Sequence, residues 1–161
     1  MSRRPKRTLL EWVTYYGLTV ERTDGLSPNV AGYLDPHKDA RFIMINRNLP
    51  LSEQNFTIAH ELAHYVRHHG RCRFPMIALL VKSLSLISFF KWARNAADGL
   101  RRFVRGLLEM EANLMAMCRL INCDAKDDIQ DYLKRHPEKK RLFLFSKCAI
   151  AAARFDKFIN P

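Results

Sequence analysis

The motif His60-Glu61-Leu62-Ala63-His64 constrains the fold of this chain more than any other feature of the sequence. It lies in a helical pattern that runs from Ser52, a good N-cap residue, to about His69. Histidines at positions i and i+4 of a helix project about 40° and roughly one turn apart, so both can reach one metal ion. The sequence therefore predicts a long helix with His60 and His64 as metal ligands.

Glu61 follows the first histidine and is offset from the histidine face by one residue. A carboxylate at that position can take a proton from an attacking water and later pass it to the leaving amine, without binding the metal itself. The apolar residues of the helix form an arc centred away from the histidines, so the helix can pack while the ligands face a cleft; they are Phe56, Ala59, Leu62, Ala63 and Val66. We predict Glu61 as the catalytic base.

A catalytic zinc site needs three protein ligands and a water, so a third ligand is expected outside the motif. His68 lies about 12 Å further along the same helix, which is too far for a shared ion. The better source is Glu109-Met110-Glu111-Ala112-Asn113, which lies on a second long helix predicted over residues 106–121.

These two motifs together resemble the ImmA/IrrE family of zinc metallopeptidases. The similar segments are Phe56-Thr57-Ile58-Ala59 with the histidine motif that follows, then Glu109 to Asn113, with a hairpin ending in Ile43-Met44-Ile45-Asn46 ahead of the first. The resemblance covers roughly residues 8–70 and 106–155. It implies a gluzincin-like site with a glutamate as third zinc ligand, and endopeptidase activity. Known members mostly cleave helix-turn-helix repressors or related regulators.

The family pattern, carried onto this chain, makes His60, His64 and Glu109 the zinc ligands and Glu61 the base. Asn113 shares a helix face with Glu109 and could orient a ligand. Glu111 competes, because it lies centrally in the apolar arc of its helix, where a buried carboxylate needs a partner. Glu109 lies off that arc, as the histidines do on their own helix, and we favour it.

The remaining patterns predict an α+β, zincin-like domain. The other expected elements are a helix over 8–16, a strand over 18–21, a hairpin of strands over 30–34 and 41–46, and helices over 127–134 and 138–158. We expect a single domain over residues 1–161, in which a small three-stranded sheet packs beside the motif helix and further helices follow it.

The two zinc-site helices are further apart in the sequence than in the family, which indicates a helical insertion at residues 73–105. The insertion combines an apolar stretch from Met76 to Phe90 with basic residues such as Arg101 and Arg102. We favour a helix packed on the domain. Docking of a partner protein and contact of residues 76–92 with a membrane surface are the alternatives.

The charge is strongly basic, with 27 Lys and Arg against 16 Asp and Glu, a formal net charge of +11. Such a balance favours an acidic protein, an anionic membrane or a nucleic acid as partner. No zinc finger, RNP motif or P-loop accompanies it, so we expect no sequence-specific nucleic-acid binding. The four cysteines form no CxxC pair, and Glu11 puts a charge where a signal peptide needs an apolar core. We therefore expect a cytoplasmic protein with reduced thiols.

The sequence thus predicts a zinc-dependent endopeptidase with a protein substrate, for which the resemblance suggests a helix-turn-helix repressor or an antitoxin-like regulator. Two alternatives stay open. A non-catalytic basic module, associated with DNA or a DNA-binding partner, would keep the helix pair without the chemistry. A toxin neutralised by a repressor-like partner would share the chemistry and differ only in its genetic context.

Overall fold

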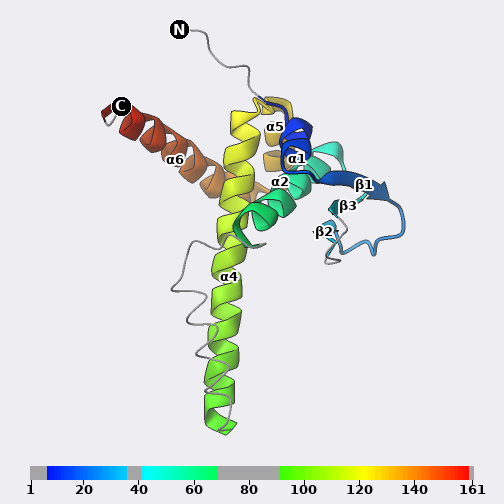
Figure 1. Cartoon of the computed structure of the whole chain (residues 1–161), viewed down its shortest axis with the longest axis vertical. Coiled ribbons are helices and arrows are strands. Elements are labelled where there is room, and N and C mark those ends of the chain that lie inside the picture. Colours follow the sequence, from blue (N-terminus) through cyan, green and yellow to red (C-terminus); the bar gives the residue numbers. More distant parts are fainter. Residues whose placement is uncertain (1–6, 36–40, 69–90, 160–161) are drawn as a thin grey trace.

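The computed structural model describes residues 7–35, 41–68 and 91–159, and its elements make a mixed α+β fold, as predicted (Figure 1). In chain order they are α1 (Leu9–Tyr15), β1 (Thr19–Thr23), β2 (Gly32–Leu34), β3 (Phe42–Asn46), α2 (Leu51–His68), α4 (Lys91–Asn122), α5 (Lys126–Arg135), the 3₁₀ turn η1 (Pro137–Lys139) and α6 (Lys140–Ile159). Helix α4 forms the long axis of the molecule, and α6 leaves it on the side opposite the sheet (Figure 1).

The sheet has three strands in the order β1-β3-β2. Strands β2 and β3 are antiparallel, which confirms the predicted hairpin, although residues 36–40 between them lie outside the described chain. Strand β1 runs parallel to β3, with Val20 opposite Ile43. The central strand β3 is therefore covered on both edges, and β2 is an edge strand.

Helix α1 begins with a capping box. The Thr8 hydroxyl accepts from the backbone N–H of Glu11 at 3.3 Å, and the Glu11 carboxylate accepts from the N–H of Thr8 at 2.6 Å. Gly17, with φ of +69°, follows the helix in the left-handed conformation that glycine adopts readily. The helix predicted over residues 8–16 is confirmed, with Thr8 and Tyr16 as its cap residues.

Helix α2 is central to the fold and packs against α1, α4, α5 and the strands β2 and β3. Its predicted apolar arc is buried: Ala59 and Leu62 are fully enclosed, in one core with Ile43 and Ile45 of β3. His60, Glu61 and His64 are among the residues of this helix that stay partly accessible.

The predicted N-cap of α2 is wrong. The helix begins at Leu51, and the Ser52 hydroxyl donates to the Asp131 carboxylate of α5 at 2.6 Å. The Asn55 amide donates to Asp128 of the same helix at 2.9 Å. The Ser52 hydroxyl donates to a charged acceptor, which makes a strong hydrogen bond, so Ser52 connects α2 to α5 instead of capping α2.

The predicted start of the glutamate helix at residue 106 is also wrong, because α4 is one continuous helix from Lys91 to Asn122. Gly106 does not interrupt it, since a single glycine inside a helix costs only about 1 kcal/mol. The last part of the predicted insertion is therefore continuous with the helix that carries Glu109. Residues 69–90, with the apolar stretch from Met76 to Phe90, lie outside the described chain.

Candidate metal centre

Helices α2 and α4 bring the three predicted ligands together. The Nε2 atoms of His60 and His64 are 3.0 Å apart, and Oε2 of Glu109 lies 3.3 Å from the first and 3.5 Å from the second. A tetrahedral zinc ion with bonds of about 2.0–2.1 Å holds its ligand atoms about 3.3 Å apart. The donor types and their spacing therefore fit a zinc ion.

Glu109, and not Glu111, is the glutamate that lies beside the two histidines. Two positions along a helix rotate a side chain by about 200°, so the two glutamates cannot face the same group. Within the described chain, these three residues form the only cluster of histidine, cysteine or carboxylate groups close enough to share a metal ion. Asn113, one turn beyond Glu109, lies within hydrogen-bonding reach of His60.

The electrostatics of the cluster favour a neutral His60. Burial of the ring, and then repulsion by His64, lower the pKa of His60, while Glu109 and Asn113 act in the opposite direction. The contact of His60 with Glu109 is therefore not a pair of imidazolium and carboxylate at neutral pH. A neutral imidazole is the form that binds metals, so the neutral ring of His60 is in the form that metal binding requires.

Glu61 lies next to this cluster but is not one of its three donors. Its Oε2 accepts a hydrogen bond from the backbone N–H of Leu34 in β2 at 3.1 Å. Burial raises the pKa of the Glu61 carboxyl, while the charge of His64 and the N–H of Leu34 lower it. A carboxylate that is partly withdrawn from water and held in one place suits general base chemistry.

A cleft of about 330 Å³ opens beside His60 and Glu61. Its wall includes Phe56, which stacks on Tyr132 of α5 with a centroid distance of 4.2 Å. Its lining also includes His136, which lies 3.5 Å from the Glu53 carboxylate and 3.6 Å from that of Glu138. The cleft therefore combines an aromatic wall with polar groups.

Sequence reasoning missed four residues that line this cleft: Gly32, Glu53, Tyr132 and His136. Gly32 could have been found, because a glycine inside a strand indicates a close approach of another chain segment. His136 precedes Pro137 and lies between the helices predicted over residues 127–134 and 138–158. Its proximity to Glu53 depends on the packing of α5 against α2, which no local pattern encodes.

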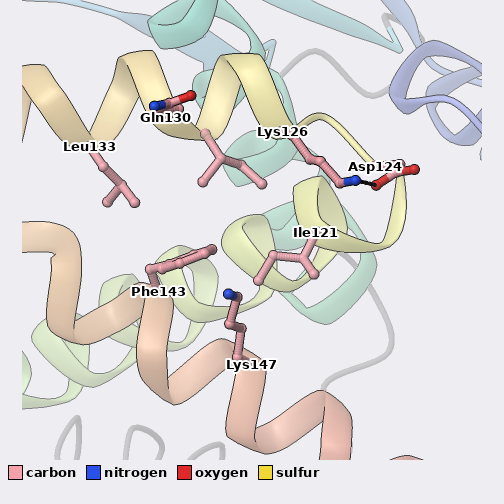
Figure 2. A pocket seen from close by; sticks show the side chains of 8 residues that line it. Ile121, Asp124, Lys126, Gln130, Leu133, Phe143 and Lys147 are labelled. Carbon is pink, nitrogen blue, oxygen red and sulfur yellow. Dashed lines mark ion pairs between the residues drawn. The ribbon is translucent and has the colours of Figure 1, made fainter.

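A second cavity, of about 340 Å³, lies between the end of α4, α5 and α6 (Figure 2). Figure 2 shows Phe143, Leu133 and Ile121 around this space, with Lys147 reaching up from α6 and Lys126 paired with Asp124 at 3.7 Å. None of its lining residues belongs to the His60–His64–Glu109 cluster. This apolar cavity therefore has no part in the metal centre.

The α+β fold, the motif helix and the paired glutamate helix define a domain of the metallopeptidase class. The IrrE N-terminal-like domain model of the M78 peptidases matches residues 13–139, and the chain belongs to this family. The match confirms the resemblance to the ImmA/IrrE family, and it ends just before α6.

No curated protein and no solved structure matches the chain. Across the described residues, every helix is either too short or too polar to cross a membrane.

Proposed function

We propose that this protein is a zinc-dependent endopeptidase, with His60, His64 and Glu109 as zinc ligands and Glu61 as the catalytic base. The observation that carries the proposal is the cluster of two imidazole nitrogens and one carboxylate oxygen, 3.0–3.5 Å apart, at the side of a cleft. Membership of a metallopeptidase family supports the same reaction class.

The residues of the cleft divide the reaction between them. When bound, zinc supplies Lewis-acid activation of the attacking water and of the scissile carbonyl. Glu61 accepts the proton of the water and passes it to the leaving amine, so that one carboxylate serves both steps. Asn113 orients His60 through the contact between them. The aromatic wall of Phe56 and Tyr132 offers an apolar surface to a substrate side chain.

The substrate class that we propose is a transcriptional regulator of the helix-turn-helix type, on the strength of the family resemblance. Such regulators act in the cytoplasm, where the free thiols of Cys118, Cys123 and Cys148 would remain reduced. The net charge of +11 would help to recruit an acidic surface of that regulator.

The test is cleavage of a regulator encoded next to the gene by zinc-loaded protein. Glu61→Gln removes the base, and we expect cleavage to slow by about 10²–10⁴-fold while zinc stays bound at one ion per chain. Glu111→Gln makes the same chemical change outside the proposed site, and its rate should match that of the unmodified protein.

Two outcomes would count against the proposal. If Glu61→Gln cleaves as fast as the unmodified protein, Glu61 is not the base. If the folded protein holds no stoichiometric zinc by elemental analysis, the non-catalytic interaction module becomes the better explanation of the helix pair.

A further inference from the structure

The edge strand β2 has a backbone amide that is not used by the sheet. Two backbone hydrogen bonds mark the ends of its antiparallel ladder with β3. At one end the N–H of Asn46 donates to the carbonyl of Ala31 at 2.9 Å, and at the other the N–H of Asp35 donates to the carbonyl of Phe42 at 3.0 Å. Bonded pairs alternate in such a ladder, so the N–H of Leu34 points away from β3, toward the open edge. The sheet itself leaves this donor available.

That donor is used by Glu61. The N–H of Leu34 donates to Oε2 of Glu61 at 3.1 Å, and it thereby joins the edge strand to the motif helix at the residue proposed as the base. Hydrogen bonds to an ionised carboxylate are about twice as strong as those between neutral groups. The contact is therefore strong enough to hold the carboxylate in one orientation.

Gly32 makes this approach of strand to helix geometrically feasible. A Cβ atom at residue 32 would lie 2.5 Å from the carbonyl oxygen of Met44 and 2.9 Å from Cγ2 of Thr57 on α2. Contacts that short essentially never occur in folded proteins, so any larger residue would push β2 away from β3 and from α2. Gly32, two residues before Leu34, thus permits the close approach of β2 to α2.

We propose that the backbone N–H of Leu34 is a positioning group for Glu61, one that binds a single carboxylate oxygen and leaves the other to accept the proton of the attacking water. This inference rests on the proposed role of Glu61 as the base. The sheet holds the donor in place before substrate arrives, so no ordering of the carboxylate is required during the reaction.

The first experiment observes the bond without zinc or substrate. In ¹⁵N-labelled, metal-free protein, Glu61→Ala removes the acceptor. We expect the Leu34 amide proton to move upfield and to exchange with solvent about tenfold faster, which corresponds to the loss of one charge-assisted bond. Glu61→Gln retains an oxygen acceptor and should give an intermediate shift. An unchanged Leu34 amide in Glu61→Ala would overturn the proposal.

The second experiment removes the donor. Leu34→Pro eliminates the N–H without breaking a bond of the β2–β3 ladder, and proline is tolerated on edge strands. Leu34→Ala also removes most of the leucine side chain but keeps the N–H. It therefore measures how much activity is lost with the side chain alone. We expect Leu34→Pro to have a kcat about 10- to 100-fold below that of Leu34→Ala, with similar KM and equal zinc content.

A kcat for Leu34→Pro equal to that of Leu34→Ala would contradict a positioning role. Failure of this inference and failure of the proposed function can be told apart. If Glu61→Gln cleaves at full rate, the base assignment fails whatever the amide shows, and a Leu34 shift in Glu61→Ala would then mark a purely structural bond. If Leu34→Pro does not fold, the amide measurement alone still decides whether the bond exists.

Discussion

Burial shifts the pKa values of several side chains around the cleft. Glu61, His60 and Tyr132 all have pKa values displaced toward the neutral form, and burial is the largest cause in each case. A charge inside a protein of low dielectric constant costs more than one in water, so the neutral forms are favoured. Around the proposed site, the folded chain thus supplies a neutral histidine and a carboxyl of raised proton affinity.

Tyr132 provides a pH prediction at the scale of one residue. Burial, and then the carboxylates of Glu138 and Glu53, raise the pKa of Tyr132 far above its ordinary value of 10. The folded state therefore keeps the proton when the unfolded chain begins to lose it near pH 10, so stability should fall as the pH rises further. Near pH 10 the slope should be a fraction of the limiting value of about 1.4 kcal/mol per pH unit, because the unfolded tyrosine is then only partly ionised.

Tyr132→Phe removes the hydroxyl and keeps the ring that stacks on Phe56. Near neutral pH we expect the variant and the unmodified protein to have similar free energies of unfolding. Between about pH 9 and 11 the free energy of unfolding should fall less in the variant than in the unmodified protein. Urea unfolding at those pH values measures the difference. Equal losses in both proteins would show that the phenol does not contribute.

At the scale of elements, two glycines differ in whether their surroundings leave room for a side chain. Gly106 lies inside the continuous helix α4, and a Cβ atom there would meet nothing within 4 Å. Gly32 lies in β2, where a Cβ atom would collide with the backbone of β3. The helix therefore tolerates its glycine, whereas the edge strand requires one.

The same substitution at these two positions should change stability in opposite directions. Gly106→Ala should raise the free energy of unfolding by about 0.5–1 kcal/mol, because alanine restricts the unfolded chain and favours the helix. Gly32→Ala should lower it by about 1–3 kcal/mol through overpacking. Urea unfolding of both variants measures this contrast, and a stabilised Gly32→Ala would mean that β2 lies further from β3 and α2 than the structure shows.

At the scale of the whole molecule, α2 is the central element, because it packs against most of the others. It contacts the sheet, α1, α4 and α5, and the proposed ligands connect it to α4 a second time, at the surface of the core. The N-terminal half of α4 and helix α6 extend away from this centre (Figure 1). A metal ion would therefore cross-link the two helices that contribute most to the fold.

Zinc should accordingly stabilise the whole fold. A ligand that binds only the folded state adds about 2.7 kcal/mol when its free concentration is 100-fold above its Kd. We expect the thermal unfolding midpoint to rise with added zinc and to fall after chelation. Glu109→Gln should lose most of this response, while Glu111→Gln should retain it. An equal response in Glu109→Gln would show that Glu109 does not bind the ion.

Local patterns in the sequence were sufficient for the elements that depend on near neighbours. Helix α1 lies within the predicted range 8–16, β2 and β3 pair as the predicted hairpin, and the motif places both histidines on one helical face. In each case, the interacting groups are close along the chain, so their relative position follows from the geometry of one element.

Only the tertiary structure decided the contacts between distant segments. The sequence favoured Glu109 and left Glu111 open, and the rotation of α4 against α2 placed Glu109 beside the histidines. The parallel pairing of β1 with β3, the bond of Ser52 to Asp131 and that of Leu34 to Glu61 were equally out of reach. Such contacts depend on how whole elements pack, and packing is determined by the complete core rather than by any single stretch of chain.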